Sequence, residues 1–336
     1  MKKLFLLVGA CIALGSCSTP DAATVIATLG GSSQAPVFLN CRAVSEDEVE
    51  FKFSLPVKVI SLSFDPVLKI ISAEDGSTIK VKFDGNLEPG AQITADLLVE
   101  DEKNNTINVL VPFRSRNNRI PEMVINELRT EYSNSSGRIR VEFIEFKMKT
   151  AGNLGAARVF VAGGSQKPTI YEFAPVEVKK GEYVVLHLRK MEEACVDEFS
   201  SNLAESGGTD ATATARDFWV PTTAKLINKA AGFVYVLDQD DKALASVMHS
   251  ETPASWWAKD YLAEAAEFLF QQNAWKSVDG EICGPRDAIS SSGATATRTI
   301  SRDETKENTN TAADWYITAT SGATPGEENN PKRYNP

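Results

Sequence analysis

The feature that most constrains this chain is a series of short runs in which apolar and polar residues alternate. In residues 34–116, turn signals divide these runs at regular intervals, and no stretch of useful length has a helical period. Val49, Phe51 and Phe53, for example, alternate with charged or polar neighbours, which is the pattern of a half-buried strand. The turn signals are Asp75-Gly76, Asp84-Gly85 and Glu88-Pro89-Gly90. The segment is therefore predicted to be an all-β sandwich.

The same segment resembles the bacterial Ig-like modules of extracellular proteins. The resemblance rests on residues 50–57, on Asn86-Leu87-Glu88-Pro89-Gly90, on residues 101–105 and on a closing strand at 109–113. It implies a spacer or a binding surface. Asp101, Glu102 and Asn104 are also calcium-ligand types, but the full loop spacing is absent, so we expect a solvated hairpin turn there.

The second segment, residues 121–330, carries a longer ordered set of motifs: 124–128, 141–146, Asn153-Leu154-Gly155, 178–186, 232–238, 300–302, Asp314-Trp315 and Thr324-Pro325-Gly326 with Asn329. In this order the motifs resemble the lamin tail domain family in its bacterial secreted form. The resemblance implies a second Ig-like β-sandwich. One departure is Lys147, where the family usually has an asparagine, so a turn-closing role does not carry over to this position.

One stretch of the second segment breaks the β pattern. Thr252-Pro253 is a helix-start signal, and an amphipathic helix is predicted over about 253–275. Its apolar stripe, expected to pack on the sandwich, contains Trp257, Tyr261, Leu262, Ala265, Phe268 and Leu269. Trp256 and Phe270 fall on the opposite, polar face, where they either mark a partner-binding surface or are covered by neighbouring loops. Asp238-Gln239-Asp240-Asp241 is predicted to be a hairpin turn.

The chain begins with two lysines and a short apolar run, which together are typical of a secretory signal peptide and too short for a permanent membrane span. The run ends in Leu14-Gly15-Ser16-Cys17. This sequence resembles the lipobox of bacterial lipoproteins and implies cleavage of residues 1–16, a lipid on Cys17 and a tether over 17–33. Ser18 is a weak signal for sorting to the outer membrane. We therefore expect a lipid-anchored protein of the cell envelope, facing either the periplasm or the surface.

Three other cysteines remain in such a mature chain. Cys195 and Cys283 both lie in loop-like sequence of the second segment, and export permits disulfides. They are predicted to form a bridge, with two free thiols as the alternative. Cys41 lies in an apolar stretch and is expected to be a buried small residue, although its role stays open.

The composition excludes several classes of function. A net charge of −10 with no basic cluster argues against nucleic acid as a partner. The chain has only two histidines, His187 and His249, and neither belongs to a catalytic or metal motif. No CxxC pair is present, so no metal or other cofactor is expected. We expect no catalytic residues and no enzyme activity, although a hydrolase that uses only carboxylates stays open.

Two functions fit these expectations. In the first, the anchored sandwiches form a binding or adhesion module whose loops or helix contact a protein or a glycan. In the second, the chain is a structural subunit or spacer of a periplasmic or outer-membrane complex. The sequence does not separate the two, and it predicts neither the ligand nor the oligomeric state.

Overall fold

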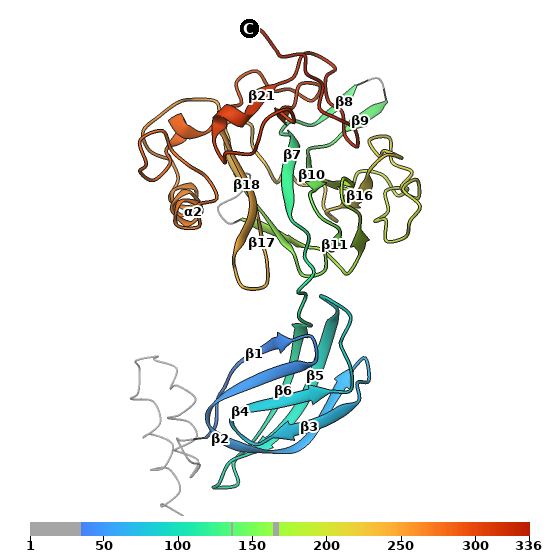
Figure 1. Cartoon of the computed structure of the whole chain (residues 1–336), viewed down its shortest axis with the longest axis vertical. Coiled ribbons are helices and arrows are strands. Elements are labelled where there is room, and N and C mark those ends of the chain that lie inside the picture. Colours follow the sequence, from blue (N-terminus) through green and yellow to red (C-terminus); the bar gives the residue numbers. More distant parts are fainter. Residues whose placement is uncertain (1–34, 136, 164–167) are drawn as a thin grey trace, which may run out of the picture. The chain divides into compact units, whose positions relative to one another are not determined.

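The computed structural model describes residues 35–135, 137–163 and 168–336. The chain divides into two compact units, and each is built mainly of β-strands (Figure 1). The first unit extends to Phe113, apart from Leu87–Ala91, which pack with the second unit. The predicted lipobox, including Cys17, lies outside the described residues. In the part of the chain that is described, no helix has the length and apolar character needed to cross a membrane.

The first unit contains β1 (Phe38–Ser45), β2 (Glu48–Asp65), β3 (Ile70–Glu74), β4 (Gly76–Phe83), β5 (Gln92–Glu100) and β6 (Thr106–Arg114). The strand order is β3-β4-β2-β5-β6, and β1 also pairs with β2. β2 has 18 residues, long enough for its first half to pair with β1 and β4 and its second half with β5. β2 thus joins the strands β1 and β4 to the strand β5.

The predicted alternation sets the core of this unit. Val49, Phe51 and Phe53 are buried, and Val49 and Phe51 lie opposite Val81 and Ile79 of β4. The expected turn at 101–105 joins β5 to β6, and Asp101 accepts hydrogen bonds from the backbone N–H groups of Lys103 and Asn105 at 2.8 Å each. The side chain of Cys41 is half-buried in β1, and burial raises the pKa of its thiol to about 12.

The second unit is a sandwich of two main sheets. One has the order β16-β15-β10-β7-β20-β21 and the other β13-β12-β17-β18-β19. The bounds in the first sheet are Met123–Arg129 (β7), Phe143–Met148 (β10), Tyr183–His187 (β15), Arg216–Trp219 (β16), Ile300–Arg302 (β20) and Trp315–Ile317 (β21). Those in the second are Arg158–Ala162 (β12), Thr169–Glu172 (β13), Ala231–Leu237 (β17), Ala243–Ser250 (β18) and Ile289–Ser290 (β19).

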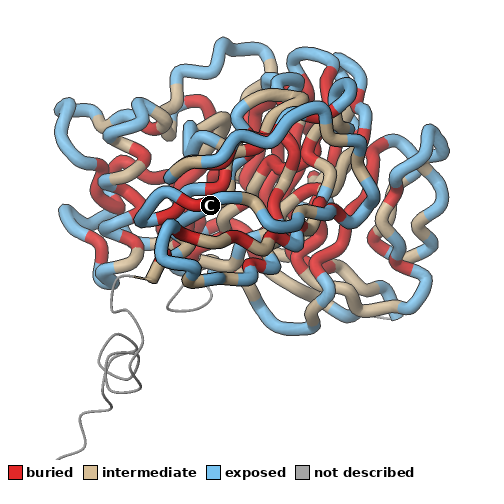
Figure 2. Tube along the Cα trace, turned by 90° about the horizontal axis from the view of Figure 1, so that it is seen from below, coloured by how far each residue is buried: buried red, intermediate tan, exposed pale blue. Residues whose placement is uncertain are grey.

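Shorter elements complete this unit. They are the hairpin β8 (Ser133–Ser135) and β9 (Arg138–Arg140), the pair β11 (Gly152–Asn153) and β14 (Glu177–Val178), the helix α2 (Asp260–Gln271), and the 3-10 turns η1 (Pro285–Asp287) and η2 (Ala312–Asp314). The expected hairpin turn at 238–241 joins β17 to β18. In the tube of Figure 2, buried residues gather in the interior and many of the outer turns are exposed.

The core of the second unit lies between its two sheets. Ile144 and Phe146 of β10 and Val184 and Leu186 of β15 face residues of β12 and β17 within one apolar cluster. The pairing of β7 with β10 contains a bulge. Glu145 pairs with Glu127 but Phe146 pairs with Ile125, which leaves Asn126 as the extra residue of β7. The alternate residues of β7 and β10 face away from the core.

The helix is shorter than predicted. α2 begins after Lys259 rather than at Pro253, because residues 254–255 pack against another loop: Arg286 N–H donates to the Ala254 carbonyl at 3.0 Å, and Gly284 contacts Ser255. The predicted stripe is confirmed, since Leu262, Ala265 and Leu269 are buried and Tyr261 and Phe268 pack against the core.

The predicted disulfide is wrong in this structure, where Cys195 and Cys283 are free and buried. Cys195 packs with Val141 and Trp219 in a small cluster, whereas Cys283 belongs to the main core. The Cys283 carbonyl accepts a hydrogen bond from Trp257 Nε1 at 2.8 Å. Each cysteine serves as a small core residue.

Candidate functional site

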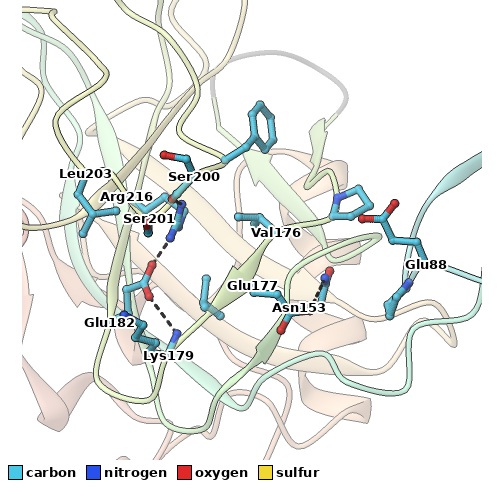
Figure 3. A pocket seen from close by; sticks show the side chains of 14 residues that line it. Glu88, Asn153, Val176, Glu177, Lys179, Glu182, Ser200, Ser201, Leu203 and Arg216 are labelled. Carbon is cyan, nitrogen blue, oxygen red and sulfur yellow. Dashed lines mark hydrogen bonds and ion pairs between the residues drawn. The ribbon is translucent and has the colours of Figure 1, made fainter.

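The second unit contains an open hollow of about 580 Å³, which we call the loop hollow (Figure 3). Its walls are Glu88-Pro89, Pro175–Lys179 and Phe199–Ser201, with the side chains of Asn153, Glu182, Leu203 and Arg216. A volume of this size falls in the range of small-ligand sites. The walls are mainly loops, which is where binding residues usually gather on a rigid scaffold.

Arg216 organises one end of the loop hollow. Its Nε donates to Glu182 Oε1 at 2.9 Å, and its Nη1 donates to the carbonyl oxygens of Glu198 and Ser200 at 2.9 and 2.6 Å. Figure 3 shows Arg216 and Glu182 directed toward each other, with Glu182 also bonded to Lys179. Arg216 is 4% exposed, so the guanidinium acts as a staple that holds the loop from residue 198 to 200.

Asn153 and Glu177 form the other end. Asn153 Nδ2 donates to Glu177 Oε1 at 3.0 Å, and Arg119 Nη2 donates to Glu177 Oε2 at 2.6 Å. The hydrogen bond from Asn153 is the main cause that holds the pKa of Glu177 below its usual value, and the hydrogen bond from Arg119 acts in the same direction. Asn153 Oδ1 accepts the Gly155 N–H at 2.8 Å, which gives the Asn153-Leu154-Gly155 motif a local structural role.

Two carboxylates fix the loop that follows Cys195. Asp197 accepts the backbone N–H of Trp219 at 2.8 Å. Glu198 accepts the backbone N–H groups of Glu205, Ser206 and Asp217 at 3.1, 3.0 and 2.9 Å. Burial raises the pKa of both carboxyl groups. The backbone of this loop is therefore tightly held.

The same loop holds two apolar side chains out toward solvent. Val196 is 41% exposed, and Phe199 is 52% exposed with its ring edge-on to Phe218 at 5.7 Å. Phe199 lines both the loop hollow and a second hollow of about 420 Å³, which also includes Tyr171, Val196 and Trp219. An apolar pair on a fixed backbone, with an aromatic ring that lines two hollows, is suited to contact a ligand.

Both histidines are buried, and neither lines these hollows. His187 Nε2 lies 2.9 Å from Asp217 Oδ1, both residues are fully buried, and the imidazole stacks on Trp219 at 3.7 Å. His249 Nε2 lies 2.8 Å from the Asn228 carbonyl, and burial lowers the pKa of His249 to about 4. Among the described residues, no three His, Cys, Asp or Glu side chains gather to hold a metal ion.

The surface predicted from Trp256 and Phe270 is not one surface. Trp256 is 78% exposed but lies in the loop before α2, whereas Phe270 is on α2 and is half-buried. Trp256 and Phe270 are fourteen residues apart, and this spacing places them on one helical face only if the helix began at Pro253. Partner binding by either residue stays a prediction. The loop of Val196 and Phe199 was missed because no signal in its sequence marks which apolar side chain is exposed.

Together these features define an all-β protein whose second unit presents a fixed loop between two hollows. A family model described as "TP_1001_2nd: protein second domain" matches residues 121–317, more than half of the chain, and the chain therefore belongs to this family. The matched residues include both main sheets, the helix and the loop from 196 to 203.

Two bacterial proteins are similar to this chain. An uncharacterized protein of Treponema pallidum (strain Nichols) is 28% identical over 208 residues, which are 60% of this chain and 52% of that protein. The chain thus spans about half the length of the curated relative it matches. The crystal structure of a DUF4876 family protein from Bacteroides thetaiotaomicron VPI-5482 is 12% identical, covers 84% of this chain and 94% of that one, and superposes with a TM-score of 0.30.

Proposed function

We propose that this chain is a lipid-anchored, non-catalytic binding protein of the bacterial cell envelope, and that its ligand contacts the loop of Val196 and Phe199. The anchor is supported by Leu14-Gly15-Ser16-Cys17, which resembles a lipobox. A second unit of the lamin tail type is supported by the ordered motifs, which end in Thr324-Pro325-Gly326. The proposed location is the cell envelope, at the outer membrane.

The observation that carries the binding proposal is the exposure of Val196 and Phe199 on a loop that is otherwise anchored. Burying a phenylalanine or valine side chain is favourable by about 1.5–3 kcal/mol relative to leaving it in water. Here Asp197, Glu198 and Arg216 hold the backbone so that Val196 and Phe199 stay outside. A partner that covers them recovers this burial energy without having to order the loop.

A protein is the ligand that this surface fits best. Aromatic residues are enriched at protein interfaces, and the two hollows beside Phe199 can each take a side chain of a partner. The absence of catalysis is supported by the burial of His187 and Asp217, because a reacting pair must be within reach of a substrate. A glycan ligand is the second outcome that the experiment distinguishes.

The experiment is photo-crosslinking on intact cells. A photo-reactive phenylalanine analogue replaces Phe199 in one strain and Trp256 in another, and exposed Val278 carries it as a control. We expect a crosslinked product from position 199 only, and protease treatment should shorten it if the partner is a protein. A product from position 256 alone would place binding at the loop before α2, and no product from any position would refute the proposal.

Protease shaving of the same intact cells, with a periplasmic protein as control, reports the side of the membrane. Digestion of the chain while the control survives indicates a surface adhesin. Protection until the outer membrane is permeabilised indicates a periplasmic partner, and a stable crosslinked complex would then favour a structural subunit.

A further inference from the structure

Three arginines meet in a small hollow of the second unit, which we call the arginine hollow. It has a volume of about 220 Å³ and lies between the β8–β9 hairpin and the C-terminal segment. Arg129 comes from the end of β7, and Arg138 and Arg140 alternate along β9, so both point to the same side of that strand. Thr297 and Ser321 add hydroxyl groups from the other wall.

The charge of the arginine hollow is opposite to that of the chain. Asp210 is the one acidic residue among those that line it, against three arginines. The chain as a whole carries a net charge of −10. Like charges repel when they are held close together, so a bound anion is favoured at this cluster.

Arg129 is built into the wall rather than lying on the surface. Its side chain is 4% exposed, its Nη1 donates to Asp210 Oδ2 at 2.6 Å and to the Val141 carbonyl at 3.1 Å, and its guanidinium lies over the Phe143 ring at 4.5 Å. Its Nε is buried and has no hydrogen-bond partner. A buried donor without a partner costs free energy.

Arg138 and Arg140 are available for a ligand. Neither side chain makes an ion pair or hydrogen bond with any residue in the described ranges, and the Ser321 hydroxyl has none either. The planar fork of an arginine matches the paired oxygens of carboxylates and phosphates. Three arginines beside one lining carboxylate favour an anion such as a phosphomonoester, which carries a charge of about −1.5 to −2 near pH 7.

We propose that the arginine hollow binds a phosphate group, with Arg138 and Arg140 donating to its oxygens and Arg129 forming the inner wall. The volume is below that of most small-ligand sites, so the group that enters is one phosphate rather than a whole large ligand. The remainder of a phosphorylated ligand would extend into solvent past exposed Arg138. This site shares no residue with the loop hollow and does not depend on the function proposed for that hollow.

The test is isothermal titration of the purified full chain with inorganic phosphate and with glucose 6-phosphate. Glucose and acetate are the controls for the sugar and for a monoanion. The variant is Arg138→Gln with Arg140→Gln, chosen because both side chains are outside the core, and Arg286→Gln is the matched exposed control. Since a hydrogen bond to a charged group is strong, we expect each lost arginine to weaken binding about tenfold or more.

Binding of both phosphates that is lost in the double variant and kept in Arg286→Gln would support the site. Binding of glucose 6-phosphate alone would support it with an attached phosphate as the source, whereas binding of inorganic phosphate alone would support it for the free ion. Equal affinity in the double variant, binding of acetate as tight as that of phosphate, or no heat from either phosphate would overturn the proposal. Thermal unfolding of each variant establishes that a loss of binding is not a loss of folding.

Discussion

Glu127 and Glu145 lie directly opposite each other on β7 and β10, and each carboxylate is capped by the backbone of the C-terminal segment. The Thr324 N–H donates to Glu127 at 3.2 Å, and the Gly326 N–H donates to Glu145 Oε2 at 2.6 Å. Both glutamates are fully buried. The face of the first sheet that points away from the core is therefore closed by a segment almost 200 residues later in the chain, bound through two acidic side chains.

This arrangement predicts that the contribution of the two glutamates to stability falls as pH rises toward neutral. Burial raises the pKa of Glu127 to about 7 from an ordinary value of 4.5. The folded chain then binds a proton that the unfolded chain has lost between these values, so stability decreases with pH across that window. Burial, and then the charge of Glu127, raises the pKa of Glu145 as well, which acts in the same direction.

The measurement is the free energy of unfolding in urea from pH 4.5 to 8, for the natural chain and for Glu127→Gln. Relative to Glu127→Gln, the natural chain should lose stability on the order of 3 kcal/mol over the window, because each pKa unit is worth about 1.4 kcal/mol. The comparison with Glu127→Gln removes the opposite contribution of His249, whose lowered pKa makes stability rise with pH below about 6.5 in both chains. Exposed Glu264→Gln should keep the profile of the natural chain. Parallel profiles for the natural chain and Glu127→Gln would contradict the expectation.

A second prediction concerns Gly326, whose N–H binds Glu145. Its φ is +83°, and a Cβ at this position would lie 2.4 Å from Thr214 Oγ1 and 3.0 Å from the Ala215 nitrogen. Gly326→Ala should therefore destabilise the chain by about 1–3 kcal/mol and expose the C-terminal segment to proteolysis. Gly181→Ala is the matched control, since Gly181 has the same φ of +83° and nothing within 4 Å. Equal loss of stability in both variants would mean that only backbone strain matters.

A third prediction follows from the free cysteines. Cys195 and Cys283 are buried, and burial raises the pKa of the Cys283 thiol to about 11. Because the thiolate is the reactive form, the folded chain should react slowly with iodoacetamide at neutral pH. In denaturant without reductant, both cysteines should be alkylated at once, as mass spectrometry of the peptides would show. If Cys195 and Cys283 were alkylated only after reduction, the result would show that they form the predicted disulfide.

A fourth prediction separates two neighbouring tryptophans. Trp257 is 9% exposed, packs on Phe233 with ring centroids 4.7 Å apart and donates to the Cys283 carbonyl. Trp257→Ala should cost about 3–5 kcal/mol. Trp256→Ala should change stability by less than about 0.5 kcal/mol, since its side chain is 78% exposed. Urea unfolding of the two variants checks this prediction. A large effect of Trp256→Ala would mean that the Trp256 side chain packs against other residues.

The extent of sequence-based prediction differs between local and long-range features. Val49, Phe51 and Phe53 gave correct core positions because alternation on a strand depends on nearest neighbours alone. The helix stripe at Leu262, Ala265 and Leu269 was correct for the same reason. The start at Pro253 was wrong because tertiary contacts to Gly284 and Arg286 outweigh a local capping signal.

The buried glutamates, the arginine hollow and the Phe199 loop could not be predicted from local sequence patterns. Glu127 and Glu145 alternate with apolar residues, so the sequence indicates side chains in solvent, and only the return of the C-terminal segment buries them. Arg129 and Arg140 are separated from Ser321 by more than 180 residues, and no pattern in the sequence brings those strands and loops together. The Phe199 loop depends on hydrogen bonds of Asp197 and Glu198 to backbone groups up to 22 residues away.

The last prediction tests whether the Phe199 loop must be fixed in order to bind. Arg216 holds the carbonyl oxygens of Glu198 and Ser200 and bonds Glu182. Arg216→Lys keeps the charge but loses the fork, so it should destabilise the chain by about 1–3 kcal/mol and raise hydrogen exchange at residues 198–203. Crosslinking from position 199 on intact cells should decline in parallel. Arg286→Lys, at an exposed ion pair, is the control and should change neither quantity. Faster exchange with undiminished crosslinking would mean that the ligand itself orders the loop, so that exposure of Phe199 on a fixed backbone would no longer account for binding.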